Sequence, residues 1–573
     1  MKTVLLILAV LPLQSFAVPS PAPAVVLPRD DEVTVEIPSG TIIGSVTGVE
    51  NFNGIPFADA PENKLRLRPP KKLSRHLGTF KAIEKAASCP QMPANSTEVN
   101  LPPLPTGSPM SPSTDDQING QEDCLTVSIQ RPKGTQPGDQ LPVLFYIFGG
   151  GFMFGGPRFN DGEKFINFAE SQGRGFVFVG VNYRVGGFGF LGGAEILEDE
   201  SANLGLLDQR MGLEWVADNI AYFGGDPRKV TIWGQSAGSI SVFDQMALYN
   251  GNATYKGNSL FRAAIMNSGS VIPTAPINSS KAQAIFDTVA EVANCTGEGV
   301  SKVNCLRDLD FKDFYHAANS VPRILDNSSL ALSYLPRPDG VILTQSPEVL
   351  ANKGQYHAVP TIIGDQEDEG TLFSFAQIDV NSTDRLIDYL SHYFFPDTTR
   401  GLVEGLVETY PETSGTGSPF RTGLLNEWYQ AEYGNGKGFK RMAAILGDFV
   451  FTLARRLAIE GMVQTNPEVP VWSYMSSFAY GLLPFYGTAH GSDLAMMFDG
   501  IGIPASSART YYLNFMFNLD PNVGETGYRN WPKWTAQDKE LLWINLLFNN
   551  VTSDTFRQTS YEFIKENTED LYF

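Results

Sequence analysis

One serine of the sequence lies in a pattern that could make it a nucleophile. Ser236 is the centre of Gly234-Gln235-Ser236-Ala237-Gly238, a G-x-S-x-G sequence. The apolar run Val230–Trp233 before it is typical of a buried strand, and Ser239–Leu248 after it is typical of a helix. A serine on so tight a turn takes a strained backbone conformation, and glycines two residues to either side avoid a clash across it. The pattern predicts a nucleophile elbow, whose hydroxyl attacks a carbonyl carbon.

A serine hydroxyl needs a base to remove its proton, and the chain has only five histidines. His490 lies in the glycine-flanked loop 487–493, downstream of the strand-like run Val471–Tyr474. Loops that follow the strands of an α/β sheet carry its functional groups, so His490 is the predicted base. The other four are interpreted as surface or packing residues, namely His76, His316, His357 and His392.

An acid is needed to hold the histidine in the correct tautomer. The loop Gly364–Gly370 follows a strand-like run and offers four carboxylates, which are Asp365, Glu367, Asp368 and Glu369. The chain order of serine, acid and histidine is the order of a known nucleophile-elbow fold. Spacing alone does not choose among the four carboxylates.

A run of three glycines supplies candidate donors for an oxyanion hole. Phe148-Gly149-Gly150-Gly151-Phe152 directly follows an apolar run of strand length. Negative charge develops on the carbonyl oxygen during acyl transfer, and fixed N–H groups must already point to it. A tight turn would explain two glycines but explains three poorly in this place. The predicted donors are the amides of Gly150, Gly151 and Ala237.

Apolar runs of strand length recur through the chain, and they must form the frame that positions these loops. They are continuous rather than alternating, which is typical of strands buried on both faces of a mostly parallel sheet, and helical stretches lie between them. This pattern predicts an α/β fold in one domain, residues 33–573, with long insertions. The runs are Val143–Phe148, Phe176–Val181, Val230–Trp233, Ala263–Met266, Val359–Ile363 and Val471–Tyr474.

Residues 1–17 have the composition of a secretory signal peptide. Lys2 is followed by the apolar run Val4–Leu13 and then by Ser15-Phe16-Ala17, a small-x-small sequence of the kind that signal peptidase cuts. A membrane anchor would need about 20 apolar residues, roughly twice the length of this run. We therefore expect an exported, extracellular protein in which residues 18–32 form an unstructured leader.

Cysteines and sequons agree with export. The chain has four cysteines, an even number, and seven N-x-Ser/Thr sequons. The short separation of Cys295 and Cys305 favours their pairing, which leaves Cys89 with Cys124. The sequence has no C-x-x-C and no histidine at ligand spacing nearby, so neither a metal nor another cofactor is expected. The candidate glycosylation sites are Asn95, Asn252, Asn278, Asn294, Asn327, Asn381 and Asn550.

The charge balance argues against nucleic acid as a partner. The net charge is −20, and no basic cluster is larger than Lys71-Lys72 with its neighbours. Binding of nucleic acid rests on neutralising phosphates with a basic face. No later segment is long and apolar enough to be a transmembrane helix. The sequence leaves the oligomeric state open, with a dimer as one option.

Several motifs resemble those of the type-B carboxylesterase/lipase family, from Val35 to Trp534. Within that family the resemblance is greatest to the fungal Candida rugosa-like lipases and sterol esterases. It implies the α/β-hydrolase fold and the hydrolysis of carboxylic esters. Besides the sequence around Ser236, the motifs are Glu122-Asp123-Cys124-Leu125, Asn182-Tyr183-Arg184-Val185, Asn203–Arg210 and Asn219–Pro227.

The resemblance also assigns the catalytic acid. It implies that Glu369 completes a triad with Ser236 and His490. The family usually has Glu where this chain has Gln235. We therefore expect the hydrogen bonding around the triad and the pH profile to differ from those of the family.

Further structural features follow from the resemblance. It implies the disulfides Cys89–Cys124 and Cys295–Cys305, and it makes the first of them the base of a mobile lid, about residues 90–123. It also implies a structural ion pair between Glu122 and Arg184.

The expected activity is the hydrolysis of long-chain lipid esters, triacylglycerols or sterol esters, through an acyl-enzyme and with transient contact to a lipid surface. One alternative is a short-chain carboxylesterase without interfacial activation. A non-catalytic relative is disfavoured, because all the expected catalytic residues are present. A choline esterase is disfavoured too, since residues 90–123 contain no aromatic residue for a cation-binding cage.

Overall fold

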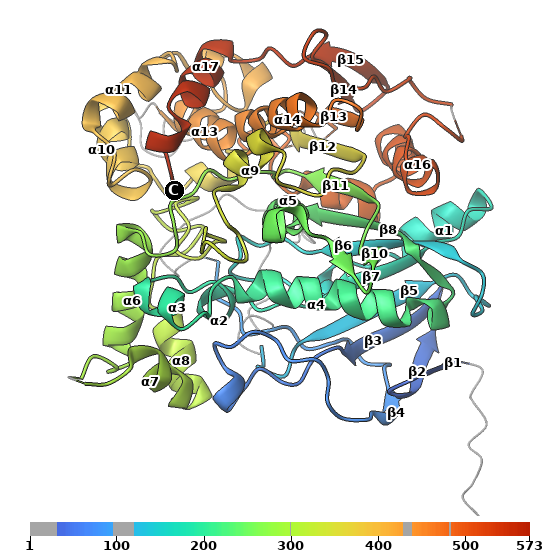
Figure 1. Ribbon diagram of the computed structural model, residues 1–573. Helices are drawn as coiled ribbons and strands as arrows, with labels where there is room; N and C mark the ends of the chain where they lie inside the picture. The colour runs from blue at the N-terminus through green and yellow to red at the C-terminus, as the bar shows by residue number, and fades with distance from the viewer. Residues whose placement is uncertain are drawn as a thin grey trace, which may run out of the picture.

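The continuous apolar runs of the sequence form the middle of one large sheet. The structure is a computed structural model that describes residues 31–94, 120–297, 299–427, 438–478, 480, 483–525 and 527–573. In this part of the chain thirteen strands join in the order β1-β2-β3-β5-β7-β6-β8-β11-β12-β13-β14-β15, with β4 beside β2. Figure 1 follows this order from the blue strands at the bottom to the red strands at the top. The strands are β1 (Glu32–Ile37), β2 (Gly40–Val46), β3 (Glu50–Pro56), β4 (Gly78–Lys81), β5 (Thr126–Arg131), β6 (Leu141–Ile147), β7 (Val177–Val181), β8 (Gly225–Gln235), β11 (Ala263–Asn267), β12 (Thr361–Gln366), β13 (Val471–Ser476), β14 (Glu540–Ile544) and β15 (Asn549–Ser553), while β9 (Thr254–Tyr255) and β10 (Asn258–Ser259) form a separate pair.

The middle of the sheet is parallel and covered on both faces. Every neighbouring pair from β7 to β14 is parallel, and every residue of β7, β11 and β12 is buried. Successive side chains of a strand point to opposite faces, so burial at every position requires cover on both sides. The predicted α/β class is confirmed. The run expected from Val359 becomes a strand only at Thr361, because Pro360 between them has no N–H to donate.

Antiparallel strands at the two edges of the sheet were not predicted. β1, β2, β3 and β5 pair antiparallel at one edge, and β15 pairs antiparallel with β14 at the other. Buried residues alternate with exposed or half-buried ones along β2, so the edge lacks the continuous apolar runs of the middle. β1 begins at Glu32, so the last residue of the expected leader already belongs to the sheet.

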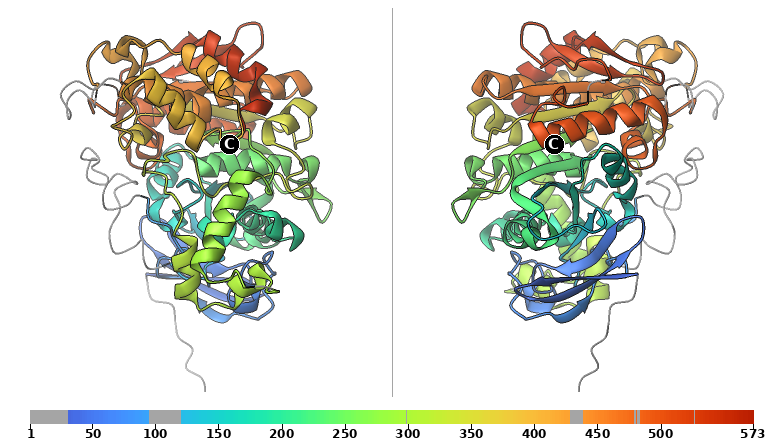
Figure 2. Two further views of the ribbon diagram at one scale, coloured as in Figure 1. Left: turned by 90° about the vertical axis from the view of Figure 1, so that its left-hand side faces the viewer. Right: turned by 90° about the vertical axis from the view of Figure 1, so that its right-hand side faces the viewer.

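Helices flank the sheet in two connected groups. Helices α4, α5, α9 and α14 pack in succession, while α16 packs with α1 and against β6 and β8. Both views of Figure 2 keep the order of Figure 1, with the N-terminal strands at the bottom and the C-terminal elements at the top. The helices are α1 (Glu163–Ser171), α2 (Gly186–Gly189), α3 (Ala194–Glu198), α4 (Leu204–Asn219), α5 (Ala237–Gly251), α6 (Ser280–Val292), α7 (Lys302–Asp308), α8 (Phe311–Ala318), α9 (Pro347–Lys353), α10 (Thr383–Tyr393), α11 (Arg400–Glu408), α13 (Phe439–Gly447), α14 (Leu453–Thr465), α15 (Ser492–Leu494), α16 (Gly502–Asn518) and α17 (Gln558–Glu566).

The ion pair expected between Glu122 and Arg184 is not formed. Glu122 binds Arg66 instead, with Nε–Oε1 and Nη2–Oε2 distances of 2.6 and 2.8 Å. Arg184 binds Asp208, with Nη2–Oδ1 and Nε–Oδ2 distances of 2.7 and 2.8 Å. Each carboxylate thus receives two parallel donors from one guanidinium, which is the favoured geometry for this pair of groups. The expectation was wrong because a nearer partner satisfies each side chain.

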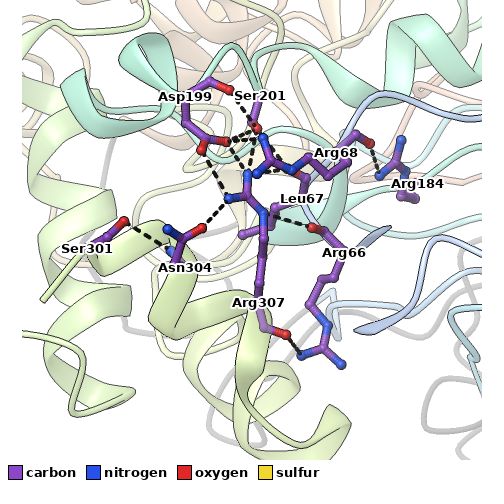
Figure 3. A network of polar contacts seen from close by, with 9 residues as sticks. All are labelled: Arg66, Leu67, Arg68, Arg184, Asp199, Ser201, Ser301, Asn304 and Arg307. Carbon is purple, nitrogen blue, oxygen red and sulfur yellow. Dashed lines mark hydrogen bonds and ion pairs between the residues drawn. The ribbon is translucent and has the colours of Figure 1, made fainter. Parts of the chain in front are cut away.

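A third arginine joins this region to α7. Figure 3 shows Arg307 reaching from α7 to the carbonyls of Arg66 and Leu67 and to the carboxylate of Asp199. The distances from Nε to the Arg66 oxygen and from Nη2 to the Leu67 oxygen are 3.1 and 2.8 Å. Since Cys305 lies on α7 and Arg66 binds Glu122, these contacts connect the surroundings of the two disulfides.

The structure forms the disulfides Cys89–Cys124 and Cys295–Cys305. Other expected features lie outside the described residues, namely the signal peptide 1–17, the leader up to residue 30, and residues 95–119 of the lid with the sequon at Asn95. In the described ranges, no helix combines the length and the apolar character that crossing a membrane requires.

A buried ionic cluster ties β12 to the end of β15. Arg455 on α14 contacts Asp365 at 2.8 Å and Asp554 at 2.7 Å, and Arg456 contacts Asp554 at 3.1 Å. Burial by itself raises the pKa of Asp554, but the two guanidinium groups outweigh it and hold that pKa below its ordinary value. The cluster therefore stabilises the fold only while Asp554 is ionised.

Replacing Asp554 by Ala should destabilise the fold by about 3–5 kcal/mol, because it leaves buried arginine charge without its partner. The measurement is urea unfolding of the wild type and the variant. The difference should shrink as the pH falls through about 4, where the carboxylate of the unfolded chain becomes protonated.

The matched control removes an exposed ion pair. Asp388 contacts Arg400 at the surface, and both side chains are about half exposed or more. Asp388→Ala should leave the unfolding midpoint unchanged within error, since exposed pairs are screened by solvent. Equal losses in the two variants would contradict the role given to the buried cluster.

Candidate active site

Ser236 lies on a strained turn between β8 and α5. Its φ is +56° and its ψ is −128°, a region that residues other than glycine rarely adopt. The Ser236 N–H donates to the carbonyl of Asn267 at 2.9 Å, at the end of β11. The predicted strand-turn-helix context of the serine is present in the structure.

Close backbone contacts explain the glycines around this turn. A Cβ on Gly238 would stand 2.0 Å from the carbonyl oxygen of Ile147, at the end of β6. A Cβ on Gly149 would stand 2.5 Å from the carbonyl oxygen of Gln235 and 2.9 Å from Cβ of Ser236. Real side chains cannot occupy such positions, so glycine is required at both sites. The loop after β6 therefore packs directly against the serine turn.

His490 and Glu369 form a buried pair. The distance from Nδ1 of His490 to Oε2 of Glu369 is 2.6 Å, and Oε1 of Glu369 accepts from the backbone N–H of Gln366 at 2.6 Å. The rings of Phe451 and Phe373 lie 4.5 and 5.1 Å from the imidazole. His490 is 5% exposed and Glu369 is 1% exposed. The other four histidines are exposed or half-buried, so His490 is the buried histidine of the chain.

Each of the four candidate carboxylates has its own partner. The segment Gly364–Gly370, here called the acid loop, begins in the last residues of β12 at the carboxyl edge of the sheet, and its side chains point to different neighbours. Of the four, Glu369 is the one that contacts His490, a distinction that spacing left open. The partners are Arg455 for Asp365 (2.8 Å), Arg421 for Glu367 (2.7 Å), the backbone amides of Phe420 and Thr488 for Asp368 (2.7 and 3.0 Å) and His490 for Glu369 (2.6 Å).

The other nitrogen of the imidazole faces the serine turn. Nε2 of His490 lies 3.4 Å from Nε2 of Gln235, the residue before the serine. Between described residues, no hydrogen bond joins the Ser236 hydroxyl to His490, and such bonds often form only once substrate is bound. If Nδ1 carries the proton toward Glu369, Nε2 is left as an acceptor that faces the amide of Gln235.

A second carboxylate lies near the imidazole. Asp493 is fully buried in α15. Burial, together with the charge of Glu369, raises the pKa of Asp493 to about 6. Asp493 thus places a second carboxyl group, besides that of Glu369, in the surroundings of His490.

Three backbone amides near the serine turn are the predicted oxyanion donors. Gly150 and Gly151 follow β6, and Ala237 is the first residue of α5. Within the described residues the N–H groups of these three amides donate to no protein oxygen. Buried N–H groups are normally paired, and a helix N-terminus adds a positive field. The three amides are thus available to a negatively charged oxygen at the serine turn.

The sequence analysis missed a pair of hydrogen bonds, here called the clamp, between the acid loop and the loop 487–493 that carries His490, here called the histidine loop. The Asp368 N–H donates to the carbonyl of Thr488 at 3.1 Å, and Oδ2 of Asp368 accepts from the Thr488 N–H at 3.0 Å. Asp368 and Ala489 also form an isolated parallel bridge. The sequence shows that Asp368 directly precedes Glu369. It contains no pattern that indicates the pairing of two loops so far apart in the chain.

Asp368→Ala should lower kcat by about 10- to 100-fold with little change in KM, because a shift of about 1 Å in a catalytic group can cost two orders of magnitude. Hydrolysis of a soluble short-chain ester gives both constants. Glu367→Gln is the control, since Glu367 lies beside Asp368 but binds Arg421 rather than the histidine loop. An unchanged kcat in Asp368→Ala would show that the clamp does not position His490.

Comparison with known sequences adds to this geometry. The sequence profile of the carboxylesterase family matches residues 31–564. A secreted triacylglycerol lipase of Gibberella zeae is 54% identical over 554 residues, which are 96% of this chain and 92% of that protein. A secreted lipase of Botryotinia fuckeliana is 50% identical and covers 94% of this chain and 93% of its own. Lipase 4 of Diutina rugosa is 38% identical and covers 94% and 97%.

Solved structures share the fold. The crystal structure of Aspergillus niger EstA aligns with a TM-score of 0.78 over 95% of this chain and 100% of its own, at 22% identity. A PNB esterase aligns with a TM-score of 0.71 over 92% and 99%, at 25% identity.

Proposed function

The chain belongs to the carboxylesterase family and is a carboxylic-ester hydrolase, and from this premise we propose that Ser236, His490 and Glu369 hydrolyse long-chain lipid esters. The observation that carries the assignment of residues is the buried contact of 2.6 Å between His490 and Glu369. That contact lies beside the strained turn that presents Ser236, so nucleophile, base and acid meet at one place.

The first half of the reaction forms an acyl-enzyme. Oγ of Ser236 attacks the carbonyl carbon of the ester, and its proton passes to Nε2 of His490. Glu369 accepts the Nδ1–H and stabilises the imidazolium. The free amides of Gly150 and Ala237 bind the negative oxygen of the tetrahedral intermediate, together with the neighbouring Gly151 amide. The intermediate expels the alcohol, which takes the proton from the imidazolium.

Water completes the second half by the same steps. His490 removes a proton from water, and the hydroxide oxygen attacks the acyl carbonyl. The new intermediate releases the carboxylic acid and returns the proton to Oγ of Ser236. No redox step or cofactor is needed to balance these steps.

The names of the relatives support triacylglycerol as substrate. The two most similar proteins described above, at 54% and 50% identity, are named as a secreted triacylglycerol lipase and a secreted lipase. We propose the same substrate class here, and a long acyl chain rather than a short one. Sterol esters and simple short-chain esters remain substrates to be compared in the test.

Export is part of the same proposal. We propose that residues 1–17 are removed and that the protein is secreted, as those relatives are named to be. Two disulfides suit an oxidising compartment. The sequon asparagines in the described part of the chain are all exposed, so carbohydrate could be attached at Asn252, Asn278, Asn294, Asn327, Asn381 and Asn550.

Purified protein should release fatty acid from emulsified triolein, and Ser236→Ala should lower that rate by at least about 10³-fold while leaving the unfolding midpoint in place. The measurement is titration of released acid, with cholesteryl oleate, a soluble short-chain ester and butyrylcholine as parallel substrates. Hydrolysis of the short ester alone would reject lipid esters and favour a simple carboxylesterase.

Conservative changes in the acid loop are the matched controls for that experiment. Glu369→Gln should lose most activity, because it removes the charge that stabilises the imidazolium. Glu367→Gln should keep most of it, and so should Asp365→Asn, although the latter weakens the buried contact with Arg455. The reverse order among these variants would move the acid to another residue of the loop.

Gln235→Glu should shift the acidic limb of the kcat/KM profile upward by about one pH unit, because a carboxylate close to the imidazole raises its pKa. The base form of His490 then appears only at higher pH. Profiles of both proteins on a soluble ester, measured from pH 4 to 9, report the ionisation of the free enzyme. Superimposable acidic limbs would show that the residue before the serine does not tune His490.

A further inference from the structure

The hairpin between β14 and β15 exposes three large apolar side chains. Leu546, Leu547 and Phe548, here called the hairpin tip, are 52%, 69% and 60% exposed. From Leu541 to Ser553 the chain carries no charged residue, although its net charge is −20. A cluster of exposed apolar side chains is unfavourable in water and marks a surface that contacts something.

The hairpin tip projects from the catalytic edge of the sheet. In the pairing of β8, β11, β12, β13 and β14, Gln235 aligns across the sheet with Leu542. The chain turns three residues after Leu542. At about 3.3 Å per residue, the turn therefore begins about 10 Å beyond the row of residues that contains Gln235, the residue before Ser236. Four strand spacings of about 4.8 Å separate β14 from β8, a lateral distance of about 20 Å.

One packed segment links the hairpin to the acid loop. Arg421 contacts Glu367 at 2.7 Å, and its guanidinium lies 3.9 Å from the ring of Tyr480 and 5.3 Å from the ring of Trp543 on β14. The guanidinium that lies over the Trp543 ring is thus already paired with a carboxylate of the acid loop. The hairpin is held in a defined position relative to Glu369.

The same segment exposes two more leucines. Leu424 and Leu425 are each 73% exposed. Beneath them Nζ of Lys440 donates to the hydroxyl of Thr422 and to the carbonyl of Gly423, at 2.7 and 2.8 Å. These bonds hold the turn next to the two leucines. The leucines follow Arg421 in the chain, so a second exposed apolar pair belongs to the segment that contacts both Glu367 and Trp543.

We propose that the hairpin tip docks on the surface of an uncharged lipid phase and holds the catalytic edge against it. The inference rests on the proposed function, since a lipid-ester substrate is presented at such a surface. An uncharged phase fits because the hairpin has no cation to attract anionic headgroups, and the net negative charge of the chain repels them. Insertion of three apolar side chains removes their surface from water and supplies the affinity.

The test separates docking from chemistry. Leu547→Ser with Phe548→Ser is made in the Ser236→Ala protein, so that substrate is not consumed, and binding to triolein droplets coated with phosphatidylcholine is measured by flotation. Half-maximal binding should need at least about tenfold more lipid. In the active protein the same pair should lower triolein hydrolysis at limiting lipid and leave kcat/KM for a soluble short-chain ester within about twofold of the wild type.

The control variant replaces two valines of similar exposure at other places on the surface. Val341 and Val523 are 69% and 51% exposed, and Val523 follows α16, whose Met516 carbonyl binds Arg262 just before β11 begins. Val523 therefore lies toward the amino edge. Val341→Ser with Val523→Ser should bind droplets like the wild type.

Because Asn550 belongs to a sequon in β15, all proteins are freed of N-linked carbohydrate before the comparison.

Several outcomes would overturn the inference. Docking by the hairpin tip is rejected if the wild type and the hairpin variant bind droplets and hydrolyse triolein equally well. It is also rejected if the control variant loses as much droplet binding as the hairpin variant. A wild type that neither binds droplets nor hydrolyses triolein overturns the lipid-ester proposal as well. Binding confined to anionic vesicles, or a dimer in sedimentation that the hairpin variant abolishes, assigns the tip to another occupant and rejects lipid docking.

Discussion

The active site depends on how closely the backbone packs where β6, β8 and α5 meet. Gly149 and Gly238 bring the loop after β6 and the start of α5 into contact around Ser236, at distances that leave no room for a side chain. This packing accompanies the positive φ of Ser236 and brings the Gly149–Gly151 loop beside the first residues of α5. The positions of Ser236 and of the amides proposed as oxyanion donors therefore follow from one constraint.

The parallel sheet extends that constraint to the other catalytic groups. Strands β8, β11, β12 and β13 end at the same edge, so residues more than a hundred positions apart meet there. The acid loop then distributes its four carboxyl groups among two arginines, two backbone amides and the imidazole. Of these four side chains, Glu369 is the one that contacts His490. Burial of this pair makes its electrostatic interaction stronger than it would be in water.

Charge and apolar surface are distributed unevenly on this molecule. The buried Arg455 pairs with Asp365 and Asp554, while the chain as a whole remains acidic. The segment Leu541–Ser553 of the β14–β15 hairpin carries no charged residue, and its turn leaves the sheet at the carboxyl edge of the parallel strands. The net negative charge of the chain and its uncharged apolar projection thus belong to different parts of the surface.

The sequence by itself determined the features that depend on neighbouring residues. The strand, G-x-S-x-G turn and helix around Ser236 are local, and so are the continuous apolar runs that predicted a parallel α/β sheet. Family resemblance supplied Glu369 where spacing left four carboxylates. It gave a wrong ion pair for Glu122 and Arg184. In the folded chain Glu122 pairs with Arg66 and Arg184 pairs with Asp208.

Only the tertiary structure decided what depends on distant segments. The clamp between Asp368 and Thr488, the separate partners of the four carboxylates and the approach of Gln235 to His490 all join loops far apart in the chain. The edge strands escaped prediction because their burial lacks the continuous pattern of the middle strands. The edge of the sheet from which the β14–β15 turn projects likewise became known only from the strand order and direction. A run of apolar residues does not by itself indicate that edge. Local patterns record which residues a segment buries, whereas the meeting of two segments is set by the packing of everything between them.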